Sequence, residues 1–272
     1  MEQGIIVAII GFCLLSIVVS LIFGYVFHVA EHGFVLLYNR PLFVHFYIKT
    51  KILNPNQSYI LYKNFPYFNS LTDKKKTYFE HRVARFIESY EFVGKDNFSI
   101  TDEVKVLIAA TSTMLTFGMR NYLYKVIDKV IVFPSSYLST VTNEYHKGEF
   151  NPRVKAIVFS WEDFVKGFET NDDNLNLGIH EFAHVLNYHG LKSSDASAII
   201  FSRMYKRINE EVNHPNNKEK LIQSNYFRIY AYTNQFEFLA VILEHYFETP
   251  ELFKQEFPQL YKNIGFMLNH NH

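Results

Sequence analysis

A continuous apolar stretch near the N-terminus limits the folds open to this chain more than any other feature. Residues 4–29 read GIIVAIIGFCLLSIVVSLIFGYVFHV and contain no Asp, Glu, Lys or Arg. As a helix rising about 1.5 Å per residue, these 26 residues exceed the roughly 30 Å thickness of a bilayer's hydrocarbon core. We therefore expect one transmembrane helix here.

A cleaved signal peptide is the competing interpretation of the same stretch. The start MEQ carries no basic residue, the apolar run is long for a signal peptide, and no A-x-A site follows it. No Lys or Arg precedes the stretch, and the first ones that follow are Arg40, Lys49, Lys51 and Lys63. The positive-inside bias then predicts a single-pass membrane protein whose main domain is cytoplasmic.

The next apolar segment, residues 33–49, is interrupted by Asn39, Arg40 and Pro41 before it reaches spanning length. We expect it to pack at the membrane surface or against the domain. A connector with Pro55 and Pro66 follows. The expected division is an anchor over 1–30, a connector over 31–73, a soluble domain over 74–268 and a tail over 269–272.

The soluble part alternates between helical and strand patterns, which predicts an α+β fold that is mostly helical with a small sheet. Apolar residues recur at the helical period over 74–93, and a buried helix is expected over 101–118. Residues 129–133 and 153–161 are rich in Val, Ile and Phe, so they are expected to be strands. The segment 143–152 between them is expected to be a loop, with His146 and Glu149 as ordinary surface residues.

The overall composition excludes some classes of partner and ligand. Lys plus Arg balance Asp plus Glu at 27 each, so the basic excess typical of nucleic-acid binding is absent and no nucleic-acid partner is expected. The chain has one cysteine, Cys13, which lies inside the apolar stretch. Any metal site must therefore use His, Asp or Glu side chains.

The sequence GIHEFAHVLNYHG, residues 178–190, combines histidines and a glutamate on one expected helix. His180 and His184 are four residues apart, so both imidazoles project from one helix face and can reach one ion. Glu181 is offset by one position, which suits a group that contacts a zinc-bound water instead of the ion. The pattern H-E-x-x-H is the zinc-peptidase signature for this reason.

Several classes of zinc protease do not fit the surroundings of this motif. Metzincins take a third ligand from H-E-x-x-H-x-x-G-x-x-H, but Asn187 and Gly190 occupy the Gly and His positions. The flanks are too short and polar for an intramembrane protease. His189 misses the metzincin position by one residue and is expected to be structural or exposed near the helix end. Asn174 is expected to cap this helix.

A later helix within residues 230–253 offers a carboxylate as third ligand. Glu237 falls in its first turn, inside an otherwise apolar run, and we take it as the ligand. Glu244 is a candidate acceptor for the other N–H of a ligand histidine. Glu248 is expected to be solvated, and His245 is an alternative ligand that points away from the Glu237 face.

With these residues identified, the chain resembles the Mlc titration factor A family of zinc-dependent peptidases, zincins related to anthrax lethal factor-like proteases. The blocks VIVFPSSY, NLGIHEFAHVLN and YAYTNQFEFLAVILEHYF resemble family blocks in the family's order, within a region from Thr77 to Phe266. The membrane span and the residues up to about Leu53 are outside this resemblance.

The resemblance implies a role for individual residues. The metal ligands would be His180, His184 and Glu237, with one zinc per chain, and Glu181 would be the general base. Tyr230, seven residues before the third ligand, would assist catalysis. The strand AIVFSW would be the edge strand along which a peptide lies. Asn187 stands where the family pattern leads us to expect Asp, which could orient a histidine or a neighbouring group. We therefore expect a change in that orientation, with metal binding kept.

These expectations combine into a membrane-tethered zinc peptidase acting on a peptide or protein substrate, with aminopeptidase action suggested by the resemblance alone. The alternative is a regulatory binding module, because the family takes its name from sequestering the transcriptional repressor Mlc. Such a module needs no general base, so the retained Glu181 favours the enzyme. His270 and His272 are expected to lie in a frayed tail.

Overall fold

The computed structural model describes residues 2–139, 143–170 and 172–270, and the chain divides into two compact units, Met1–Leu42 and Phe43–His272. The first unit is helix α1, Glu2–Tyr38. It is long and apolar enough to cross a membrane, and its large apolar side chains from Ile5 to Val29 are exposed. The helix continues past residue 30, and Asn39 with φ 53° follows its end.

The second unit contains a four-stranded sheet in the order β1-β2-β6-β5. Its strands are β1 Glu91–Gly94, β2 Lys129–Phe133, β6 Ala156–Ser160 and β5 Gly148–Asn151. The first three are parallel, and β5 runs antiparallel to β6. Two short strands, β3 Tyr137–Leu138 and β4 Tyr145–His146, pair separately.

The place of β6 in the sheet corrects one expectation. The segment AIVFSW is not the edge strand, because β6 lies between β2 and β5 and every one of its residues is buried. The edge strand next to β6 is β5, which lies inside the segment expected to be a loop, and β1 forms the other edge. Its sequence GEFN lacks the β-branched residues that mark a strand and contains a glycine, so pairing with β6 decides its conformation.

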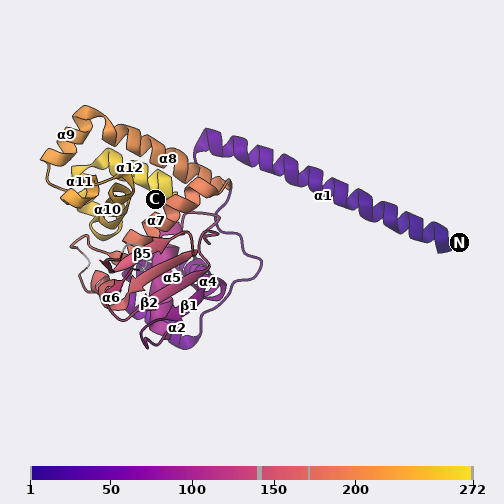
Figure 1. Ribbon diagram of the computed structural model, residues 1–272. Coiled ribbons are helices and arrows are strands. Elements are labelled where there is room, and N and C mark those ends of the chain that lie inside the picture. The colour runs from indigo at the N-terminus through magenta and orange to yellow at the C-terminus, as the bar shows by residue number, and fades with distance from the viewer. Residues whose placement is uncertain (1, 140–142, 171, 271–272) are drawn as a thin grey trace. The chain divides into compact units, whose positions relative to one another are not determined.

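Helices surround this sheet and form most of the second unit, which confirms the α+β fold (Figure 1). They are α2 Pro55–Asn64, α3 Pro66–Ser70, α4 Asp73–Ser89, α5 Asp102–Thr116, α6 Trp161–Glu169, α7 Leu177–Lys192, α8 Ala196–Asn213, α9 Pro215–Gln223, the 3-10 helix η1 Ile229–Tyr232, α10 Gln235–Glu248, α11 Pro250–Glu256 and α12 Pro258–Leu268. The helix expected over 74–93 ends at Ser89, because the following residues pair with β2 as β1.

Helix α5 forms the centre of the core, and a buried arginine holds its C-terminal end. Arg82 on α4 is fully buried and donates hydrogen bonds to the carbonyl oxygens of Thr116, Phe117 and Met119. A cation near the last carbonyls of a helix is favourable because of the helix dipole. Arg82 also donates to the Tyr47 hydroxyl, so the segment around Tyr47 is attached to this core.

Helix α7 lies between the sheet and the C-terminal helices and contacts β5, β6, α5, α8 and α10 (Figure 1). Its first turn approaches α6 closely: a Cβ atom at Gly178 would lie 2.7 Å from Phe164 Cε2. The glycine therefore allows α7 to pack against α6. This packing presents one face of α7 to β5 and α10.

Candidate metal centre

The two motif histidines lie on α7, and the glutamate lies in the first turn of α10. Asn176 caps α7, with its Oδ1 accepting the N–H of Ile179 at 3.0 Å. The expectation that Asn174 is the cap is wrong, because Asn174 lies in the preceding loop with φ 56°. Asn234 caps α10 in the same way and accepts the N–H of Glu237 at 3.0 Å.

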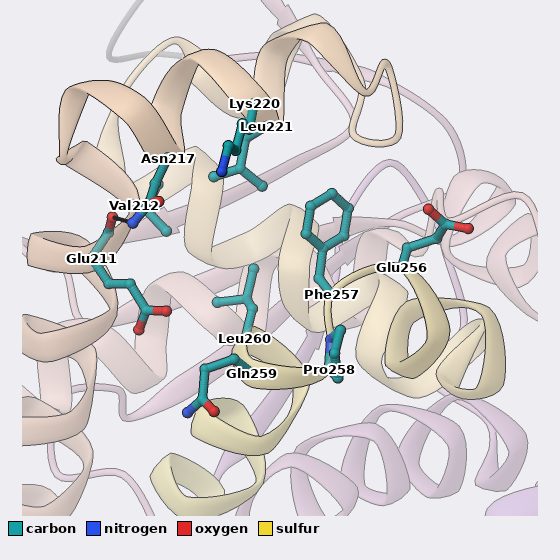
Figure 2. A pocket seen from close by; sticks show the side chains of 10 residues that line it. All are labelled: Glu211, Val212, Asn217, Lys220, Leu221, Glu256, Phe257, Pro258, Gln259 and Leu260. Atoms are coloured by element: carbon teal, nitrogen blue, oxygen red, sulfur yellow. Dashed lines mark hydrogen bonds between the residues drawn. The ribbon is translucent and has the colours of Figure 1, made fainter.

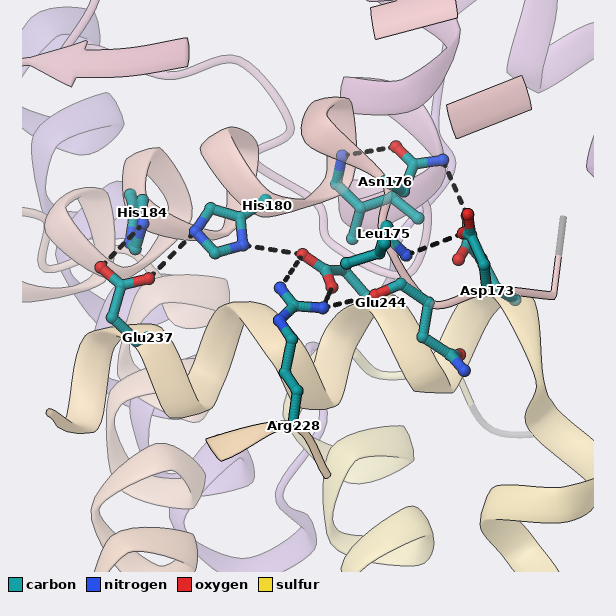
Figure 3. A network of polar contacts seen from close by, with 11 residues as sticks. Asp173, Leu175, Asn176, His180, His184, Arg228, Glu237 and Glu244 are labelled. Carbon is teal, nitrogen blue, oxygen red and sulfur yellow. Dashed lines mark hydrogen bonds and ion pairs between the residues drawn. The ribbon is translucent and has the colours of Figure 1, made fainter. Parts of the chain in front are cut away.

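The packing of α7 on α10 brings the three expected ligands together (Figure 3). Glu237 Oε2 lies 3.0 Å from His180 Nε2, and Glu237 Oε1 lies 3.7 Å from His184 Nε2. One atom from each of the three residues falls within 4.8 Å of the others. Their side chains are 13–20% exposed, so the centre is open on one side.

This donor set fits a zinc-type ion. Bond lengths of about 2.0–2.2 Å from zinc to nitrogen and oxygen place tetrahedral ligands roughly 3.3 Å apart, and the 3.0 and 3.7 Å separations bracket that value. Glu237 Oε2 is buried and has no hydrogen bond of good geometry among the described residues. Three protein ligands with an open side are typical of a catalytic site.

Glu181 lies beside the ligands under the edge strand. It is 6% exposed, and burial raises its pKa to about 7, although the charge of His180 opposes the shift. The Phe150 N–H on β5 donates a hydrogen bond to its carboxylate. Gly148 contacts it so closely that a Cβ atom would lie 2.7 Å from Glu181 Cγ. Strand β5 therefore positions this carboxylate.

Tyr230 lies in η1 on the other side of the centre. Its ring centroid is 6.1 Å from that of His180, and half of the residue is exposed. Burial of the hydroxyl, together with the nearby Glu237 carboxylate, raises the pKa of Tyr230 to about 12. The phenol therefore stays protonated at neutral pH and can act as a hydrogen-bond donor.

The other nitrogen of His180 contacts a buried carboxylate. His180 Nδ1 lies 2.7 Å from Oε1 of Glu244, which is 1% exposed. Burial opposes the charge of His180, but the adjacent carboxylates of Glu237 and Glu244 outweigh it and raise its pKa to about 10. Burial and the charge of His180 lower the pKa of His184 to about 4. These directions hold for the metal-free side chains.

Arg228 completes this group and was not expected from the sequence. It pairs with Glu244 through both terminal nitrogens, and it also donates to the Asn174 carbonyl oxygen (Figure 3). Arg228 precedes η1 in an irregular segment. No periodicity or motif in the sequence distinguishes it from an ordinary surface arginine. Only the tertiary structure shows its position.

The structure does not bring every expected residue to the centre. Asn187 is buried, and its Oδ1 has no hydrogen-bond partner in the part of the chain that the structure describes. His245 packs on the rings of Tyr226 and Phe227 and lies outside the ligand group. His189 is buried, with Nε2 at 3.6 Å from Asp195 Oδ2, as a structural residue.

Three surface expectations are also corrected. Glu248 is not solvated, because it is partly buried and accepts a hydrogen bond from Asn176 Nδ2 at 3.0 Å. Glu149 lies on β5 and accepts one from the Ser139 hydroxyl at 2.8 Å. The His270 N–H donates to the Gly265 carbonyl oxygen, so this residue is attached to α12, whereas His272 lies outside the described residues.

A cleft of about 690 Å³ opens beside the metal ligands. It is lined by residues of β4, β5, α6, α7 and the Arg228–Glu244 pair, including His146, Lys147, Gly148, Leu177, His180, Glu181, Arg228 and Glu244. A second pocket of about 240 Å³ lies between α8, α9 and α12 (Figure 2). Its lining includes Leu221, Phe257 and Leu260 and none of the three ligands. Of these two, only the first is lined by Glu181 and by one of the three ligands, His180.

Comparison with known proteins agrees with this geometry. Residues 44–267 match the family described as glucose-regulated metallo-peptidase M90. The uncharacterized protein slr2042 of Synechocystis sp. is 24% identical over 232 residues, which cover 77% of this chain and 82% of that protein. Mlc titration factor A of Escherichia fergusonii is 24% identical over 222 residues, covering 73% of this chain and 80% of that protein.

These matches confirm the resemblance to the Mlc titration factor A family and extend it towards the N-terminus. The matched region starts at residue 44, beside Tyr47, which Arg82 holds against the core. It contains the three ligands, Glu181 and Tyr230, while α1 lies before it. A metallopeptidase family implies a bound metal, and the ligand group described above provides a site for it. The chain belongs to the glucose-regulated metallo-peptidase M90 family.

Proposed function

We propose that this protein is a zinc-dependent peptidase that hydrolyses peptide bonds in the cleft beside α7. The observation that carries the proposal is a ligand group of His180, His184 and Glu237 next to a buried glutamate with a raised pKa. A metal site that served only to stabilise the fold would not need Glu181 at this position. A bound zinc ion would supply a Lewis acid able to activate water and polarise a carbonyl group.

The residues around the ligands have separate roles in this proposal. Glu181, buried beside the ligands, accepts a proton from the attacking water and later returns it to the leaving amine. The Tyr230 hydroxyl donates a hydrogen bond to the oxyanion that develops on the substrate carbonyl. A buried carboxylate beside the ligands and a phenol near them are the groups that such a hydrolysis needs.

The edge strand offers a template for the substrate backbone. Within the described chain β5 pairs only with β6, and apart from the Phe150 N–H that binds Glu181 its outer edge can add a peptide in extended conformation. Gly148 on this strand contacts Glu181, so a peptide paired with β5 passes the catalytic carboxylate. The cleft beyond Gly148 would receive side chains on one side of the scissile bond.

We also propose that α1 tethers the protein to a membrane with the peptidase domain in the cytoplasm. The length and exposed apolar side chains of α1 support the tether, and the basic residues that follow it support the orientation. Extraction of isolated membranes with sodium carbonate should leave the protein in the pellet. Release of the full-length protein into the supernatant would contradict the tether.

Similarity to Mlc titration factor A favours a second candidate function, the binding of a regulatory protein. This binding need not compete with peptide hydrolysis. The buried Glu181 beside the ligands supports turnover, because a surface that only sequesters a partner has no use for a general base.

The substitution Glu181→Gln tests the peptidase proposal. The zinc-loaded full-length protein in detergent should cleave members of a fluorogenic peptide library, and Glu181→Gln should lower kcat by about 10²–10⁴-fold with zinc content unchanged. Glu210→Gln, at an exposed position on α8, is the matched control and should retain full activity. Zinc binding without turnover on any peptide would favour the binding function instead.

A further inference from the structure

Arg228 lies on the wall of the cleft, at a point where three segments of the chain meet. Its side chain is 28% exposed and lines the cleft together with His180 and Glu181. It contacts Glu244 on α10 and the Asn174 carbonyl oxygen in the loop before α7, while its own segment leads into η1 (Figure 3). No single helix or strand contains all these contacts.

The contact with Glu244 fixes the orientation of a carboxylate. Arg228 Nη2 donates to Glu244 Oε1 at 3.0 Å, and Nη1 donates to Oε2. Such a two-point pair between planar groups restricts rotation more strongly than a single contact. The same Oε1 lies 2.7 Å from His180 Nδ1. By fixing the Glu244 carboxylate, the Arg228 guanidinium therefore also restricts the orientation of the His180 imidazole.

The orientation of this imidazole decides whether the metal site forms. With Nδ1 held by Glu244, His180 directs Nε2 towards Glu237 at 3.0 Å. Acceptors that hold the far nitrogen of a ligand histidine set its ring orientation, and their loss typically costs 10–100-fold in metal affinity. Arg228 holds Glu244, the acceptor in contact with His180 Nδ1, and so acts on His180 through Glu244.

The contact with Asn174 fixes the start of α7. Asn174 has φ 56°, and its side-chain oxygen accepts a hydrogen bond from the Thr249 hydroxyl at 2.8 Å. Two residues later Asn176 caps the metal-binding helix. The loop before α7 is thus attached to Arg228 through its backbone and to α10 through Thr249.

Arg228 also lies close to the expected oxyanion donor. Tyr230 follows two residues later, and the guanidinium carbon lies 5.9 Å from the centre of its ring. Half of Tyr230 is exposed, so packing holds only part of the side chain. The polar contacts of Arg228 therefore restrict the segment that carries the tyrosine.

We propose that Arg228 is a positioning residue that couples the orientation of the ligand His180 to the placement of Tyr230. It acts through Glu244 and the backbone, and it neither binds the metal nor contacts the reacting atoms. The inference rests on the proposed peptidase function and adds to it a residue outside the H-E-x-x-H motif.

The variants Arg228→Lys and Arg228→Met test this role in the full-length protein. Arg228→Met should lower zinc affinity about 10–100-fold in chelator competition, and it should change the visible absorption spectrum of the cobalt(II)-substituted protein. Arg228→Lys keeps the charge but not the planar fork, so it should fall between Arg228→Met and wild type. At saturating zinc both should lower kcat more than they change KM. Arg85→Met, at an exposed ion pair with Glu88, is the control and should match wild type.

Each outcome distinguishes this inference from the proposed function. Zinc affinity, cobalt spectrum and kcat equal to wild type in both Arg228 variants would overturn the inference and leave the peptidase intact. A wild-type protein that neither binds zinc nor cleaves peptides would overturn both. If Arg228→Met does not fold, Arg228→Lys decides: a wild-type zinc affinity and kcat in Arg228→Lys would overturn the inference.

Discussion

The metal ligands and the residues proposed to act beside them lie on different kinds of structure. The ligands lie on α7 and α10, whose inner residues such as Phe182 and Leu239 are fully buried. Glu181 is contacted by the short strand β5, next to β4, and Tyr230 lies on the single turn η1 on the other side of the centre. Tyr145 of β4 is 77% exposed and Ile229 of η1 is 89% exposed.

This difference separates metal binding from catalysis. Helices packed against several neighbours hold the ligand geometry through many small contacts, which individual substitutions on the short segments do not remove. Tyr230 and Gly148 lie on short segments. Changes on these short segments should therefore lower turnover and spare the metal, and the following variants test that separation.

The largest effect on the short segments is expected for Tyr230→Phe. Loss of one preorganised donor to an oxyanion typically lowers kcat by about 10²–10³-fold. Zinc content and KM should change little, because the ring is kept and the hydroxyl is not a ligand. Steady-state kinetics on a cleaved fluorogenic peptide measures the effect. The control is Tyr232→Phe in the same turn. The Tyr232 hydroxyl donates to the Leu221 carbonyl oxygen, away from the metal ligands, so its loss should leave kcat unchanged. A loss of kcat equal to that of Tyr230→Phe would contradict the role of Tyr230.

A smaller loss of turnover is expected for Gly148→Ala. The added methyl group would lie 2.7 Å from Glu181 Cγ and 2.8 Å from its Oε1, so the carboxylate must move. Displacement of a catalytic group by about 1 Å can cost up to 10²-fold, and we expect kcat to fall about 10–100-fold with zinc retained. Gly265→Ala is the control, since its methyl group would meet nothing closer than 3.6 Å. Unchanged kcat in Gly148→Ala would mean that β5 does not position Glu181.

The smallest effect concerns stability and a residue at the end of helix α10. Burial raises the pKa of Glu248 to about 7, although the hydrogen bond from Asn176 opposes the shift. Because the folded pKa exceeds the ordinary value of 4.5, the folded state loses stability as pH rises from 4.5 through 7.

Glu248→Gln should remove this pH dependence. A pKa shift of one unit corresponds to about 1.4 kcal/mol of unfolding free energy, and the partial exposure of Glu248 reduces this value. The variant should therefore be more stable than wild type by about 1–2 kcal/mol at pH 8. The difference should disappear near pH 4, in urea unfolding of the detergent-solubilised protein. Glu251→Gln on α11 is the exposed control. A variant less stable than wild type at pH 8 would show that the hydrogen bond to Asn176 outweighs the burial of the charge.

The same contrast between helices and short segments explains how much of the site the sequence alone predicts. Helical spacing predicted that His180 and His184 share a face, and an isolated glutamate in an apolar run identified Glu237. Both patterns are local and repeat with the helix period. The capping asparagine was misplaced by two residues, because Asn174 and Asn176 both have suitable side chains and only the fold of the loop separates them.

The short segments are predicted poorly because their structure is not local. Strand β5 has no alternating apolar pattern and exists through its pairing with β6, so the sequence pattern predicts a loop there. The family resemblance in turn implied that β6 is the edge strand, and the pairing of β5 corrects this. Arg228 acquires its role from three segments distant in sequence, and Glu248 is buried only because α10 meets the loop before α7. Local sequence patterns do not contain such contacts.

The central claim is that α7 and α10 jointly hold one catalytic metal, and zinc stoichiometry tests it most directly. Full-length wild type and Glu237→Ala, both carrying His270→Ala and His272→Ala to remove adventitious ligands, should be dialysed against trace zinc and measured by mass spectrometry. We expect about one zinc per chain in wild type and a value close to zero in Glu237→Ala. Equal zinc in the two proteins, or none in wild type, would contradict the account.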